Sequence, residues 1–138
     1  MSDRESILEA NRAFYRAFAT LDAEGMGKLW LRDQRIVCIH PGWNRLIGWG
    51  PIMNSWQRIF ENVFEMEVEL GDLQVMTSGD LAVVVVEENL LQRGYDGTSR
   101  SRVLATNVFE RAEGQWWMVS HHGSPVIQPS DSEEPPLQ

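Results

Sequence analysis

The sequence lacks a second cysteine, and this absence limits the kind of protein it can be. Cys38 is the only cysteine among 138 residues, so no internal disulfide can form and the fold does not depend on an oxidising compartment. The first residues carry charges rather than an apolar signal core, and no apolar stretch approaches the roughly 20 residues that a membrane-spanning helix needs. We therefore expect a cytoplasmic protein with no membrane partner.

Basic residues are also scarce. Lys and Arg total 12 against 20 acidic residues, for a net charge of −8. Proteins that bind nucleic acids need clustered Lys and Arg to displace counterions, and no such cluster occurs, so no nucleic-acid partner is expected. The sequence also contains no phosphate-cradling loop, nucleophile elbow, paired-cysteine motif or calcium loop. No cofactor is predicted.

What is present is an ordinary globular composition with many tryptophans. Hydrophobic residues make up 43% of the chain and charged residues 23%, which is enough to bury one core. Six Trp against two Tyr indicate broad apolar surfaces that are buried or line a pocket. We expect a single domain over residues 1–127 and a disordered acidic tail, rich in Pro and Ser, over residues 128–138.

Helical periodicity dominates the first half of the sequence. Ser2 and Glu5 have the spacing of a capping box, and apolar residues then recur on one helical face. Gly25 and Gly27 weaken the next helix. The predicted elements are a helix over Asp3–Leu21, a short helix over Ala23–Leu31, a strand over Arg35–His40, a brief strand over Asn44–Gly48, and a helix that opens at Gly50 and Pro51 and carries Ile52, Trp56, Ile59, Phe60 and Val63 on its apolar face.

Strand-like alternation replaces the helical period in the second half. Within the first strand the apolar parity changes at Gly71 and Asp72, which predicts a bulge that bends the strand. Long strands bent in this way curl around a helix, so an α+β cone with a pocket is expected. The four predicted strands form a meander over Phe64–Thr77, Leu81–Arg93, Ser99–Arg111 and Gln115–Ser124.

Four segments carry a family resemblance: the first helix, Ile39–Trp43 with Leu46–Ile52, Ala105–Arg111, and Gly114–Pro125. They resemble the nuclear transport factor 2-like superfamily, in its SnoaL-like or ketosteroid-isomerase-like branch. The last segment also resembles the end of the association domain of calcium/calmodulin-dependent protein kinase. The likeness covers nearly the whole chain outside the tail.

This resemblance implies a cystatin-like cone with helices on a strongly curved antiparallel sheet, frequently a homodimer built on the open sheet face. It implies no single activity, because members include isomerases, cyclases, dehydratases and oligomerisation hubs. The leading expectation is a small-molecule-binding domain whose ligand is apolar with one polar handle, with or without isomerase, cyclase or dehydratase activity. The alternative is an oligomerisation module like the kinase association domain.

The three histidines do not predict a metal site. His121 and His122 are neighbours on a strand and point to opposite faces, while His40 shares a strand face only with Cys38. We assign His122 to the pocket because it has the same parity as Trp116 and Met118 on that strand.

Glu87 and Glu88 interrupt an apolar strand, and one of them must face inward if the strand is regular. A carboxylate inside the cone would have a raised pKa, as a general base requires, with Tyr15 or His122 donating to a developing oxyanion. The other interpretation is an outward glutamate paired with Arg102 or Arg100.

Asn107 lies in the middle of an apolar strand, either as a pocket residue or as a structural amide. The matching position of the kinase association domain carries a pocket arginine, so no carboxylate-binding role is carried over. Trp43 and Trp56 are candidate walls for a flat ligand, although large aromatics more often fill cores. The candidate ligand-binding residues are Tyr15, Trp30, His40, Trp43, Trp56, Asn107 and His122, and no catalytic residue is assigned.

Overall fold

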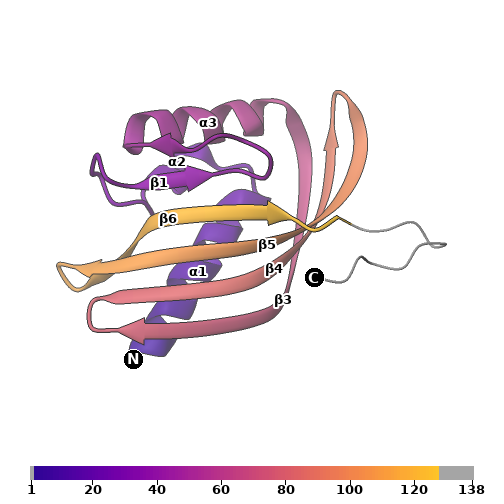
Figure 1. Ribbon diagram of the computed structural model, residues 1–138. Coiled ribbons are helices and arrows are strands. Elements are labelled where there is room, and N and C mark those ends of the chain that lie inside the picture. The colour runs from indigo at the N-terminus through magenta and orange to yellow at the C-terminus, as the bar shows by residue number, and fades with distance from the viewer. Residues whose placement is uncertain (1, 128–138) are drawn as a thin grey trace.

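Three helices and six strands form residues 2–127, the part of the chain that the computed structural model describes (Figure 1). The predicted disordered tail, residues 128–138, lies outside the described residues. In chain order the elements are α1 (Asp3–Ala19), α2 (Ala23–Gly27), β1 (Val37–Ile39), β2 (Leu46–Ile47), α3 (Trp49–Glu61), β3 (Val63–Ser78), β4 (Leu81–Gly94), β5 (Gly97–Ala112) and β6 (Gln115–Pro125).

Helix α1 begins with the predicted capping box. The Ser2 hydroxyl accepts a hydrogen bond from the backbone N–H of Glu5 at 3.2 Å and donates one to its carboxylate at 3.0 Å. The first bond satisfies a backbone donor that has no partner inside the helix, and the second joins the two side chains. The helix ends at Ala19, slightly before the predicted end, and Leu21 takes a positive φ of 56°.

The other two helices differ in extent from the predictions. α2 ends at Gly27 instead of Leu31, because two glycines in five residues remove most of its helical preference. Trp30 therefore lies beyond the helix and forms an isolated parallel bridge with Met118 of β6. α3 begins at Trp49, with Pro51 in its first turn as expected, and Val63 belongs to β3 rather than to the helix.

The predicted four-strand meander is confirmed. β3, β4, β5 and β6 pair antiparallel in sequence order, and β1 extends the sheet by pairing parallel with β6. The full strand order is β2-β1-β6-β5-β4-β3. The parallel pairing was not predicted, and it brings the end of β1 beside the histidines of β6.

Besides a register shift between Val63 and Glu65 at the start of β3, two irregularities change the direction of side chains along the sheet. The pairing of β3 with β4 shifts between Gly71 and Gln74, which confirms the predicted bulge. A second shift lies in β6, where Met118 pairs with Phe109 but Ser120 pairs with Val108, so one extra residue is inserted into β6. Each bulge bends its strand and reverses the facing of the residues that follow.

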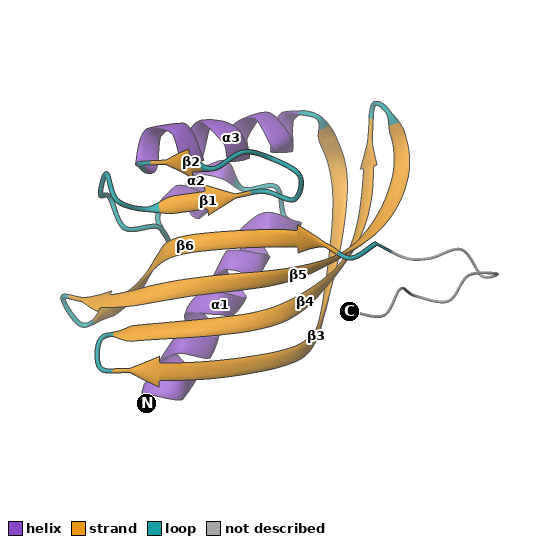
Figure 2. Cartoon of the chain, in the orientation of Figure 1, coloured by secondary structure: helices purple, strands orange, loops and turns teal. Residues whose placement is uncertain are grey.

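The helices cover one face of the sheet (Figure 1). α1 crosses behind the long strands, while α3 lies beside β1 and β2 at one end, and the hairpin between β4 and β5 curls toward that end (Figure 2). The core fills the space between the helices and the sheet, with Phe14, Trp56 and Phe109 among its largest buried side chains. No helix among residues 2–127 is long and apolar enough to cross a membrane.

Candidate functional site

A cavity of about 370 Å³ lies between the curved part of the sheet and helix α3. This volume falls at the lower end of the range of roughly 300–1,000 Å³ found for small-molecule sites. Its walls are largely apolar and include three aromatic rings, and its polar groups come from separate elements. Its lining includes Phe18 of α1, His40 and Trp43 at and after the end of β1, Trp56 of α3, Glu88 of β4 and His121 of β6.

Glu88 is the acidic group of this cavity. Its side chain is only 1% exposed, and the Tyr15 hydroxyl donates a hydrogen bond to its Oε2 at 2.5 Å. Burial raises the pKa of Glu88 to about 7, and the Tyr15 hydrogen bond lowers it in part. Glu87 points to the opposite face and pairs with Arg102. The prediction that one glutamate faces inward is confirmed, and so is the pairing expected for an outward one.

Asn107 connects Tyr15, the hydrogen-bond donor to Glu88, with His121. Its Nδ2 donates to Asn11 Oδ1 at 2.9 Å and to the Tyr15 oxygen at 3.1 Å, while its Oδ1 lies 2.6 Å from His121 Nδ1. The amide is fully buried and does not line the cavity. Asn107 and Tyr15 therefore support Glu88 and His121 from behind, which resolves Asn107 in favour of the structural interpretation.

His40 and His121 are both neutral at pH 7. Burial lowers the pKa of His40 to about 4. For His121, burial is the largest cause and the nearby His40 and His122 add to it, which together lower its pKa to about 3. Both rings lie against Trp56, with centroids 4.7 Å and 6.0 Å from it. The three residues thus form one packed cluster at the cavity wall.

The assignment of His122 to the pocket is wrong. His122 is exposed, and His121 is the residue that faces inward. The parity argument would have held on a regular strand, since Met118 does face the core. The extra residue in β6 lies between Met118 and Ser120, and it reverses the facing of everything after it.

The tryptophans divide between the cavity and the core. Trp56 lines the cavity and is 1% exposed, while Trp43 stands at the opening, 43% exposed, with its ring edge-on to His40 at 4.8 Å. Trp30 faces inward as expected, but it packs in the core beside Met118 and does not line this cavity. The expectation of Trp30 as a cavity wall is therefore corrected.

Two buried polar residues of the site were not predicted. Asn11 lies on the apolar face of α1, and Ser55 of α3 holds the ring of His40, whose Nε2 is 2.8 Å from the Ser55 hydroxyl oxygen. The signal for Asn11 was an amide among the apolar positions of an amphipathic helix. For Ser55 there was no signal beyond a small residue next to Trp56. Among residues 2–127, no group of three or more His, Cys, Asp or Glu side chains could hold a metal ion.

The sheet is curved and open, its helices cover one face, and a cavity lies at one end. This arrangement defines the class of nuclear transport factor 2-like domains with a cystatin-like fold. Within this class, the chain belongs to the SnoaL-like family, because residues 7–128 match the family model described as a SnoaL-like domain. The resemblance inferred from the sequence is confirmed, and so is the α+β fold class.

Solved structures agree with this assignment. A candidate dehydratase of the NTF2-like family from Streptomyces avermitilis is 34% identical, with a TM-score of 0.86 over 91% of this chain and 98% of that one. A candidate calcium/calmodulin-dependent protein kinase type II association domain from Thiobacillus denitrificans is 31% identical, with a TM-score of 0.77 over 86% of this chain and 93% of that one. A Caulobacter vibrioides protein with a cystatin-like fold shares 19% identity and a TM-score of 0.79, over 90% and 89% of the two chains.

The F-box protein SKIP8 of Arabidopsis thaliana is a curated relative. It is 29% identical over 124 residues, which are 88% of this chain and 50% of that protein. The chain thus spans about half the length of the curated relative that it matches.

Proposed function

We propose that the cavity binds a small, mostly apolar molecule with one polar group. The observation that carries this proposal is the convergence of Glu88, His40 and His121 on one largely apolar cavity. A fold that needed only a packed core would gain nothing from a buried carboxyl group, because desolvating it costs free energy. Apolar walls with few convergent polar groups are the usual form of a ligand site.

A fluorinated fragment library, followed by ¹⁹F NMR, tests this proposal. Fragments that bind are expected to broaden or shift in their ¹⁹F spectra and, in ¹H–¹⁵N spectra of the protein, to shift the indole N–H resonances of Trp43 and Trp56. Ser101→Phe places a large ring at an exposed position of the cavity lining, so it should abolish binding, whereas Ser99→Phe, exposed on the same strand outside the lining, should not. The proposal fails if no fragment binds, or if both variants bind the fragments as the wild type does.

Isomerase, cyclase and dehydratase reactions need a group that accepts and returns a proton, and Glu88 is the residue of this cavity best suited to that role. The candidate dehydratase at 34% identity supports a reaction of this class. Fragments that bind can be incubated with the protein in D₂O. Deuterium incorporated at carbon by the wild type but not by Glu88→Gln would support catalysis, and its absence for every bound fragment would argue against it.

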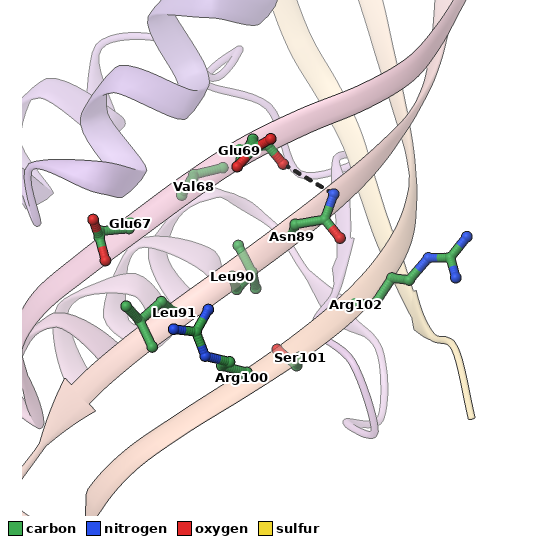
Figure 3. Close-up of a pocket in the computed structure, with 9 residues that line it drawn as sticks. All are labelled: Glu67, Val68, Glu69, Asn89, Leu90, Leu91, Arg100, Ser101 and Arg102. Atoms are coloured by element: carbon green, nitrogen blue, oxygen red, sulfur yellow. Dashed lines mark hydrogen bonds between the residues drawn. The ribbon is translucent and has the colours of Figure 1, made fainter. Parts of the chain in front are cut away.

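We also propose that the outer face of the sheet pairs with a second copy of the chain. This face is free of helices among the described residues (Figure 2), and it exposes large apolar side chains, with Met76, Leu81 and Leu104 exposed by 64%, 47% and 49%. At its curved end, Glu67 and Glu69 of β3 lie across β4 from Arg100 and Arg102 of β5 (Figure 3). A two-fold axis would place the acidic strand of one copy against the basic strand of the other.

Native mass spectrometry measures this assembly directly. The wild type is expected to be a dimer, and Leu104→Asp, in the middle of the face, should give monomers. Tyr95→Asp is the matched control, because Tyr95 is 82% exposed in the turn between β4 and β5 and away from the face. A monomeric wild type would overturn the proposal, and a larger assembly would favour the oligomerisation module over a simple dimer.

A further inference from the structure

The hydrogen bonds around the cavity determine which of its polar atoms are donors. The Ser55 hydroxyl donates to the carbonyl oxygen of Ile52 at 2.6 Å, so in its 2.8 Å contact with His40 the proton must belong to His40 Nε2. Asn107 Oδ1 can only accept, so His121 Nδ1 must donate to it. In both neutral rings, the second nitrogen is therefore a bare acceptor.

The polar atoms of Glu88, His40 and His121 that remain free are thus all acceptors. No hydrogen bond among residues 2–127 uses His121 Nε2, and Tyr15 bonds only one oxygen of Glu88, leaving Oε1 available. His40 Nδ1 has only the weakly donating thiol of Cys38, 4.0 Å away. The Trp56 Nε1 donor also has no partner, but the atom itself is buried.

The cavity also lacks a positive charge to balance Glu88. Neither Lys nor Arg lines it, and no ion pair of the described residues includes this carboxyl group. The lining includes the aromatic rings of Phe18, Trp43 and Trp56, and the face of an aromatic ring attracts a cation rather than an anion. The net charge of −8 over the whole chain acts in the same direction at longer range.

We infer that the ligand of this cavity is an apolar amine, whose ammonium group donates to Glu88 Oε1 and His121 Nε2 while its hydrocarbon part packs against Phe18 and Trp56. This inference rests on the proposed ligand-binding function and specifies its chemistry. An ammonium group supplies both a positive charge and several donors. An alcohol supplies one donor and no charge, and a carboxylate would face three acceptors.

Three probes with the same ring distinguish these classes: benzylamine, benzyl alcohol and benzoate, titrated at neutral pH and followed by the Trp indole N–H resonances. Benzylamine should bind about tenfold or more tightly than benzyl alcohol, the ratio expected when a charge-assisted hydrogen bond replaces a neutral one. Benzoate should bind least. Glu88→Gln should remove the advantage of the amine and leave the affinity for the alcohol nearly unchanged.

Glu87→Gln is the matched control, since Glu87 is the adjacent residue on the opposite face, and it should keep the preference for the amine. If Glu88→Gln does not fold, saturating the wild type with benzylamine should still lower the pKa of the Glu88 carboxyl group in a ¹³C titration. The amine inference is overturned if benzyl alcohol or benzoate binds as tightly as benzylamine or more tightly, or if benzylamine does not change the pKa of Glu88. Either result leaves the proposed ligand-binding function standing. If no probe binds and the fragment library also finds no site, the proposed function fails with it.

Discussion

Glu88 and its partners are the residues whose protonation most affects this protein. The carboxyl group is buried with one hydrogen bond, from Tyr15, and the nearest imidazole rings are neutral. Burial and the negative charge of Glu88 also raise the pKa of the Cys38 thiol to about 12, so that thiol stays protonated. The site is therefore most sensitive to pH through Glu88.

Replacing this carboxyl group should change how stability depends on pH. The pKa of Glu88 is about 7 in the folded protein against a reference value of 4.5, so the folded state holds the proton more tightly than the unfolded state. Ionisation then destabilises the fold as pH rises from about 4.5 through 7. Relative to wild type, Glu88→Gln should gain up to about 3 kcal/mol in free energy of unfolding across this window, measured by urea denaturation at pH 4.5 and 8.

The two buried histidines change the stability with pH in the opposite direction, and they are present in both the wild type and Glu88→Gln. His40 and His121 have lowered pKa values, so each destabilises the fold as pH falls below 6.5. Their contributions cancel in the difference between the variant and the wild type. A difference that stays constant with pH would contradict the burial of an ionisable Glu88.

Asn107→Leu should destabilise the protein strongly. It would leave Asn11 and His121 without hydrogen-bond partners inside the core, and each buried unpaired group costs about 1–3 kcal/mol. We expect a loss of at least about 2 kcal/mol in the free energy of unfolding, measured in urea. The adjacent Thr106→Val, on the outer face, should change it by no more than about 0.5 kcal/mol. Similar effects for both variants would show that the amide network contributes little.

At the scale of elements, the bulge in β6 decides which histidine is structural. Because the strand gains one residue between Met118 and Ser120, His121 packs against Phe14 and Trp56 while His122 meets solvent. His121→Ala should therefore lower the free energy of unfolding by about 2 kcal/mol or more, through a cavity and an unpaired Asn107. His122→Ala should stay within about 0.5 kcal/mol. Chemical denaturation of both variants checks this, and the reverse order would mean that β6 is regular.

For the whole molecule, the main prediction concerns the open face of the sheet. If two copies pair there, the melting temperature should rise with protein concentration, because association stabilises the folded chain by mass action. Calorimetry over a hundredfold range of concentration measures this directly. Leu104→Asp should remove the concentration dependence and Tyr95→Asp should retain it. A wild type that melts at one temperature throughout would count against the dimer.

Much of the fold could be predicted because its signals are local. The capping box at Ser2 and Glu5, the amphipathic face of α1 and the alternation of β4 depend on residues only a few positions apart. The short elements were predicted less well. α2 ends four residues earlier than the predicted Leu31, and β1 is held by pairing with β2 and β6 rather than by its own sequence.

The site was predicted only in part, for the same reason. Alternation along one strand placed a glutamate inside the cone, and the periodicity of α3 placed Trp56 there. Neither pattern indicates which residues of other elements stand opposite. Asn11 was missed because its role depends on a hydrogen bond from Asn107 of β5, which lies 96 positions later in the chain.

By itself, the sequence determined the α+β class, the bent meander and the presence of one inward-facing glutamate, because hydrophobic periodicity acts over a few neighbouring residues. Only the tertiary structure decided that His121 rather than His122 faces the cavity, and that His121 lies near His40, which the sequence had already made a candidate. Those outcomes depend on one inserted residue in β6 and on the parallel pairing of β1 with β6. Both are contacts between segments far apart in the chain, where packing selects the register and no local pattern records the choice.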